Sequence, residues 1–87
     1  MKILMKPVDM IAHFVPDDLP HPLRLRTSDD DGEPIVISIK QIFTKSVESV
    51  AKQKFFLYRC QCDVNGLSRP IELKYDCSAC KWYIFKF

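Results

Sequence analysis

Short runs in which hydrophobic and polar residues alternate dominate the chain. In the clearest run, over 54–64, the hydrophobic positions are Phe56, Tyr58, Cys60, Cys62 and Val64. Residues 35–42 and 70–77 repeat the same period of two, with Ile35, Ile37 and Ile39 on one face of the first and Ile71, Leu73, Tyr75 and Cys77 on one face of the second. Strict alternation over four to eight residues is typical of a β-strand with one buried face.

Three further segments extend this pattern. Residues 22–27 alternate leucine with arginine, which predicts a strand with Leu23 and Leu25 facing inward. The segment 81–87 is apolar on both faces and predicts the last strand. A first strand over about 7–15 is also expected. Its inward side chains would be Val8, Met10, Ala12 and Phe14.

Turn-forming residues separate these runs at 15–22, 28–34, 65–66 and 76–79. Such spacing predicts one all-β domain over 1–87, with six strands in an antiparallel meander. Closing the meander, fully or partly, into a small barrel removes exposed edges and makes one core. An open sheet covered by a short helix is the alternative.

The segment 44–53 fits two structures. Val47, Val50 and Ala51 have the spacing of a helix face, with Ser46 as a possible N-cap, so at most one short helix is expected here. A loose hairpin fits the same residues.

The four cysteines form a C-x-C…C-x-x-C set, a spacing that suggests structural zinc. The ligands would be Cys60, Cys62, Cys77 and Cys80. A hairpin at Asn65–Gly66 places Cys60 opposite Ile71, or opposite Leu73 if the loop is longer. Cys77 then lies roughly 13–20 Å from Cys60 along the strand, whereas zinc needs sulfurs about 4 Å apart. We therefore expect buried, reduced cysteines in preference to a metal site.

Cys77 and Cys80 also have the spacing of a redox pair, but the strand–helix–strand context of thioredoxin-like motifs is not expected here. No apolar run reaches the roughly 7–15 residues of a secretory signal, so we expect a cytoplasmic protein with no membrane partner. Neither His13 nor His21 has acidic residues at metal-ligand spacing. We expect no catalytic residue and no cofactor.

Charge is unevenly distributed along the chain. Residues 1–33 carry four Lys and Arg against seven Asp and Glu, and residues 34–87 carry nine against four. The run of acidic residues at 29–33 lacks the frame of a calcium-binding loop and predicts a turn. A net charge of +2 is low for a protein that binds phosphate groups.

An interaction surface is the best candidate for function. Pairing across the last turn sends Trp82 and Ile84 inward, so Tyr83, Phe85 and Phe87 are expected to point outward. The basic residues expected on outward faces nearby are Arg24, Arg26, Arg59 and Lys74. This surface predicts a protein-interaction or accessory module, with self-association through an open last strand as one form. Binding of single-stranded nucleic acid is the alternative.

A set of local strings carries a resemblance over most of the chain: His13-Phe14, Pro22-Leu23-Arg24-Leu25-Arg26, Phe56-Leu57-Tyr58-Arg59-Cys60, Glu72-Leu73-Lys74-Tyr75 and Cys80-Lys81-Trp82. These strings resemble short all-β accessory proteins of Gram-positive bacteria, often encoded among mobile-element genes. The resemblance implies an accessory role and carries over no catalytic residue.

Overall fold

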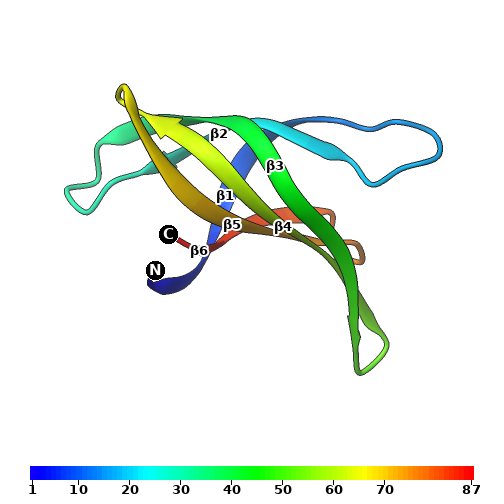
Figure 1. Ribbon diagram of the computed structural model, residues 1–87. Helices are drawn as coiled ribbons and strands as arrows, with labels where there is room; N and C mark the ends of the chain where they lie inside the picture. Colours follow the sequence, from blue (N-terminus) through cyan, green and yellow to red (C-terminus); the bar gives the residue numbers. More distant parts are fainter.

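The computed structural model describes all of residues 1–87 and consists of six antiparallel strands closed into a small barrel (Figure 1). The predicted all-β meander is confirmed, and no helix is present. The strands are β1 Ile3–His13, β2 His21–Ser28, β3 Pro34–Val50, β4 Gln53–Val64, β5 Leu67–Asp76 and β6 Lys81–Lys86. No helix of the structure is therefore long and apolar enough to cross a membrane.

Pairing of β1 with β6 closes the barrel. Lys2 and Phe87 exchange two backbone hydrogen bonds, each with a nitrogen–oxygen distance of 3.0 Å, beside this pair of strands. The expectation that the last strand has an open edge is wrong, because β5 and β1 occupy its two sides. Self-association through β6 therefore has no free backbone groups to use over the paired residues.

The inner faces of the strands form one hydrophobic core. Its ten buried residues are Leu25, Ile37, Tyr58, Cys60, Cys62, Ile71, Leu73, Tyr75, Trp82 and Ile84. Most of these positions were predicted from the period of two in 35–42, 54–64 and 70–77, because each of these strands has only one buried face. The aromatic rings pack closely, with 4.8 Å between the ring centroids of Tyr75 and Trp82.

The hairpin of β4 and β5 turns at Asn65 and Gly66, as predicted from this dipeptide. Val64 pairs with Leu67, and Cys60 lies opposite Ile71, so the shorter of the two expected loops is the one formed. Both turn residues have positive φ, 51° for Asn65 and 81° for Gly66, which Asn and Gly adopt most readily.

The helical interpretation of 44–53 is wrong. These residues form the ends of β3 and β4, joined by a two-residue turn at Ala51 and Lys52. The resulting hairpin arm extends beyond the barrel at the lower right of Figure 1. Apolar residues in a short segment fit helical and strand spacing equally well. Here the segment forms a strand because its residues pair with β4.

Bulges change the side of the sheet that several predicted residues face. Leu23 is the extra residue of a bulge between β1 and β2, and it is exposed, contrary to the prediction that it faces inward. The neighbouring Pro22 is buried instead. Phe14 was also predicted inward, but β1 ends at His13 and Phe14 is 60% exposed.

The other expected features of the first half are present. Val8, Met10 and Ala12 pack against the core, as predicted, although β1 begins at Ile3 instead of near residue 7. The acidic segment 29–33 forms a turn in which the Asp29 carboxylate accepts hydrogen bonds from the backbone N–H groups of Asp31 and Glu33.

Candidate functional site: the free edge of β3

The two neighbouring strands β2 and β3 separate after a short ladder. Their pairing runs from Ser28 with Pro34 to Arg24 with Ser38 and then stops. Beyond that point β2 continues against β1, and β3 continues against β4. Pro22 lacks the backbone N–H that a ladder requires, so this end of β2 is a poor partner for β3.

Residues 39–50 of β3 consequently have a strand partner on one side only. Bulges at Lys40 and Phe43 interrupt the first part of this segment, because Gln41 and Thr44 pair one residue out of step with β4. From Thr44 to Val50 the strand is regular and its outer edge has no neighbour. We call the segment 44–50 the free edge of β3.

The turn at the end of the arm fixes which backbone groups point away from β4. A two-residue hairpin loop is closed by a hydrogen-bonded pair, here Val50 and Gln53. Counting back in steps of two, Glu48 and Ser46 also turn their backbone groups toward β4. The N–H and C=O groups of the intervening residues are therefore unpaired along the free edge. These residues are Lys45, Val47 and Ser49.

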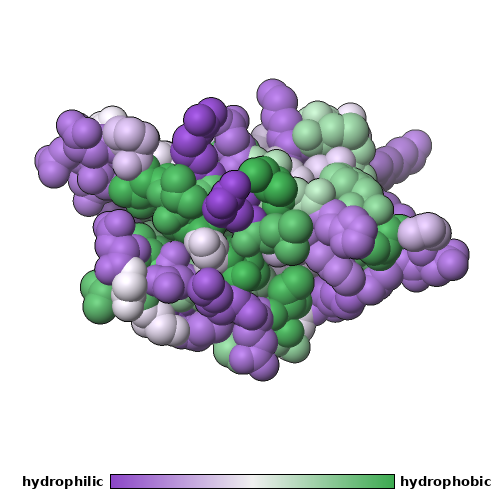
Figure 2. Space-filling model, turned by 90° about the horizontal axis from the view of Figure 1, so that it is seen from above, coloured by the Kyte–Doolittle hydropathy of each residue, from purple (hydrophilic) through white to green (hydrophobic).

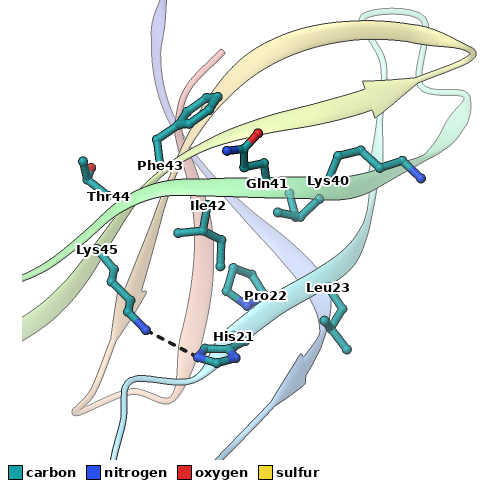
Figure 3. A pocket seen from close by; sticks show the side chains of 10 residues that line it. His21, Pro22, Leu23, Lys40, Gln41, Ile42, Phe43, Thr44 and Lys45 are labelled. Atoms are coloured by element: carbon teal, nitrogen blue, oxygen red, sulfur yellow. Dashed lines mark hydrogen bonds between the residues drawn. The ribbon is translucent and has the colours of Figure 1, made fainter.

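A groove of about 410 Å³ lies where β2 and β3 separate (Figure 3). It is lined by residues 21–23 of β2 and 39–45 of β3. Ile39 and Ile42 both pack against the core, because the bulge at Lys40 places residues three apart on the same side. The groove thus begins at the core and leads out to the free edge.

Charged side chains join the two strands at the outer end of this groove. The Lys45 ammonium donates a hydrogen bond to the Asp18 carboxylate at 2.5 Å, and His21 lies 3.1 Å from the same oxygen. These two contacts hold the pKa of Asp18 well below its usual value, the lysine contributing most. In Figure 3, Lys45 and His21 reach toward each other across the groove.

Hydrophobic side chains are exposed along the same region. On the arm, Val47 is 50% and Val50 is 54% exposed, and the bulge residue Phe43 is 55% exposed. Elsewhere, on the upper side of the barrel, the view in Figure 2 shows hydrophobic residues gathered in a band between hydrophilic ones. Large exposed apolar groups beside unpaired backbone are typical of an interaction site.

The structure distributes the predicted interaction residues over several faces. Arg24 and Arg26 are exposed on the outside of β2, where Arg26 forms an ion pair of 2.9 Å with Asp9. Tyr83 and Phe85 lie on β6, and β1 stands between them and β2. Arg59 is exposed on β4, opposite Glu72.

Phe87 departs from the prediction that it points outward. Phe85 is the extra residue of a bulge against β5, since Ile84 pairs with Leu73 and Lys86 with Glu72. The bulge shifts the alternation by one, so that Phe87 packs against the core. The Arg69 guanidinium covers its ring at 3.8 Å from the centroid.

A second cluster joins β6 to its neighbours. The Lys74 ammonium lies 4.2 Å from the ring centroid of Phe85 and 5.4 Å from that of Phe55, and it pairs with Tyr83 in the ladder. We call the four residues Phe55, Lys74, Tyr83 and Phe85 the aromatic–lysine face. The sequence pattern predicted that three of its members, Lys74, Tyr83 and Phe85, point outward, and the register of β4 with β5 adds Phe55.

The cysteines occupy two separate places. Cys60 and Cys62 are buried in the core, where burial raises the pKa of the Cys60 thiol to about 12. Cys77 and Cys80 lie in the turn between β5 and β6, and all four thiols are free. No group of three or more His, Cys, Asp or Glu side chains lies close enough together to hold a metal ion.

Lys45 and Val47 were missed as functional residues. The only signal that pointed to them was the apolar spacing of 44–53, which was compatible with a helix as well as with a strand. A search of family models, curated proteins and solved structures found no match to the chain. The resemblance to accessory proteins of Gram-positive bacteria therefore stays a prediction.

Proposed function

We propose that this protein is an interaction module that binds an extended segment of a partner protein as an additional strand along the free edge of β3. The observation that carries the proposal is the unpaired outer side of residues 44–50, which belong to the longest stretch of strand in the barrel with a partner on one side only. Unpaired backbone groups in a row are matched best by another extended polypeptide.

The length of the edge sets the size of the bound segment. Seven residues of strand span roughly 23 Å, enough to pair with a peptide of similar length. The bulges at Lys40 and Phe43 interrupt the pairing geometry toward the barrel. A bound strand would therefore lie along the arm, next to the groove.

Side chains along the edge specify the chemistry of the partner. Lys45, Val47 and Ser49 share the face of the arm that Tyr58 and Phe56 occupy on β4. A strand added antiparallel would place one side chain opposite Val47 and another, two positions away, opposite Lys45. An apolar residue at the first position and an acidic residue at the second complement this edge. The partner carboxylate would replace Asp18 as the ligand of Lys45.

A designed heptapeptide tests this proposal. The blocked peptide Val-Thr-Lys-Val-Thr-Glu-Thr places its second valine opposite Val47, its glutamate opposite Lys45 and its lysine opposite Glu48. We expect it to bind, as measured by shifts of the backbone amide resonances of residues 44–50. A matched peptide with lysine in place of glutamate should bind more weakly.

Two substitutions at one position separate the backbone from the side chain. Val47→Pro removes an N–H that points away from β4, so the ladder of the arm is kept while the free edge loses a donor. Val47→Thr keeps the donor and the β-branched shape. Binding should be lost in the first variant and kept in the second.

Equal binding by the two variants, or no amide shift on the arm at millimolar peptide, would overturn the proposal. Analytical sedimentation tests whether the bound strand comes from a second copy of this chain. A dimer of the unmodified protein that Val47→Pro converts to a monomer would make a second copy of this chain the occupant, in place of a different protein.

A further inference from the structure

We propose that the aromatic–lysine face is a second, separate interaction site, and that it binds single-stranded nucleic acid. The four residues of this face lie on the outside of the adjacent strands β4, β5 and β6. It is distinct from the free edge of β3 in the groups it offers, which are rings and ammonium groups instead of unpaired backbone.

The geometry brings rings and a cation together across three strands. Leu57, Lys74 and Tyr83 form one row across the sheet, and Phe55 and Phe85 flank Lys74. The three rings are each half-buried. Rings held in this way by a sheet are suited to stacking against unpaired bases, since every base presents a flat π-face.

Lys74 forms one ion pair, which a phosphate would displace. Its ammonium lies 3.6 Å from the Glu48 carboxylate, and its side chain is only 15% exposed. A phosphate of the nucleic acid would take the place of the Glu48 carboxylate and pair with the Lys74 ammonium, which the rings already hold in position. Phosphate on Lys74 and a base stacked on Phe85 would follow one another along a single strand of nucleic acid.

Charge favours an anionic partner on this side of the barrel. On the outer face of β4, β5 and β6 the register places four basic residues, Arg59, Lys74, Lys81 and Lys86, against three acidic ones, Asp63, Glu72 and Asp76. One of the acids, Asp76, is buried and bound within its own turn. Of the seven acidic residues in 1–33, Asp9 lies on β1 and the other six lie in the loops that follow β1 and β2. This uneven field steers phosphate toward the aromatic–lysine face.

The kind of cation distinguishes nucleic acid from protein as the partner. Around the rings the basic residues are mostly lysines, namely Lys74, Lys81 and Lys86, with Arg59 nearby. Protein interfaces are depleted in lysine and enriched in arginine relative to the rest of the surface. Basic side chains beside aromatic rings that stack on bases are common in sites for single strands.

The test is the fluorescence anisotropy of a labelled oligothymidylate, with a duplex of equal length as the comparison. We expect the single strand to bind more tightly than the duplex. With about three phosphate contacts, affinity should fall roughly 20-fold between 50 and 200 mM salt. Phe85→Ala should weaken binding about tenfold through the loss of one stacked base.

Two double variants that reverse charge at exposed residues provide a matched control, because neither alters a residue of the core. Arg59→Glu with Lys81→Glu alters exposed residues beside the aromatic–lysine face, whereas Arg24→Glu with Arg26→Glu makes the same charge change on β2. Only the first pair should abolish binding.

Equal loss of affinity in the two double variants would show attraction by net charge alone and would overturn the assignment to this face. Absence of binding to the oligonucleotide at 50 mM salt, a permissive condition, would overturn the site altogether. Neither result would affect peptide binding at the free edge of β3, because that test substitutes a different residue, Val47, and uses a different ligand.

Discussion

The carboxylate of Asp76 organises the turn between β5 and β6. One of its oxygens accepts hydrogen bonds from the hydroxyl and the backbone N–H of Ser78, at 2.8 and 3.0 Å, and from the N–H of Ala79 at 3.2 Å. The Ser78 hydroxyl contributes most to a pKa of Asp76 below its usual value. The turn that presents Cys77 and Cys80 therefore depends on a charged side chain.

This arrangement predicts a dependence of stability on pH. Because the pKa of Asp76 is lower in the folded chain than the ordinary value of 3.8, its ionised form stabilises the fold above about pH 4. That stability is lost as the pH falls through the lowered pKa. Thermal unfolding measured between neutral pH and pH 2 should show a smaller loss in Asp76→Asn, which cannot titrate. An identical pH dependence in the two proteins would contradict this role.

Single cysteines differ in the reactivity that we expect. Burial raises the pKa of Cys60 to about 12 and also raises that of Cys62, whereas Cys80 is exposed. Since the thiolate is the reactive form, iodoacetamide should label Cys80 first and leave the two core thiols unlabelled in the folded protein. Peptide mass spectrometry after timed labelling measures this order. Equal rates at Cys60 and Cys80 would show that the core is not closed.

At the scale of strands and turns, the two hairpins on either side of β4 differ in how well the sequence predicts them. Asn65–Gly66 was identified directly, because these residues favour the positive φ that the turn requires. Ala51 and Lys52 adopt positive φ as well, 49° and 68°, but neither residue favours it. The hairpin at the end of the arm was therefore not distinguished from a helix.

The same observation predicts a stabilising change. Replacing Ala51 by Asn and Lys52 by Gly supplies residues that suit the turn without altering any core contact. We expect the free energy of unfolding to rise by about 1 kcal/mol. Urea unfolding measures it as a higher midpoint with an unchanged slope. A lower midpoint would mean that the turn at 51–52 is not formed.

Bulges are the features that alternation does not predict. The extra residues Leu23, Lys40, Phe43 and Phe85 carry no common signal in the sequence, yet each changes the face of the residues after it. For this reason Leu23 and Phe87 were assigned to the wrong sides, while the uninterrupted strand β4 was assigned correctly. A bulge depends on the partner strand, which a pattern within one strand does not contain.

At the scale of the whole molecule, the closed ring of strands leaves a small core that depends on each large side chain. Leu73 is completely buried at the centre of β5, whereas Leu67 at its start is 70% exposed. Leu73→Ala should lower the free energy of unfolding by about 3 kcal/mol, and Leu67→Ala should change it by less than about 0.5 kcal/mol. Denaturant unfolding of both variants checks this contrast. Equal effects would contradict the arrangement of the core.

Closure of the barrel was one of two outcomes left open by the sequence. Local alternation predicts strands and hairpins, but the pairing of β1 with β6 joins the two ends of the chain. The divergence of β2 from β3 is likewise a property of the assembled barrel. The free edge of β3 therefore exists only in the assembled barrel and could not be predicted from the alternation within one strand.

Amide hydrogen exchange along the arm tests the account most directly. In the free protein the amides of Lys45, Val47 and Ser49 should exchange rapidly, while those of Ser46 and Glu48, turned toward β4, are protected. Addition of the designed heptapeptide should slow exchange at the first three and leave the other two unchanged. Protection of Lys45, Val47 and Ser49 in the free protein, or no slowing with the peptide, would contradict the proposal that β3 presents an open edge for a partner strand.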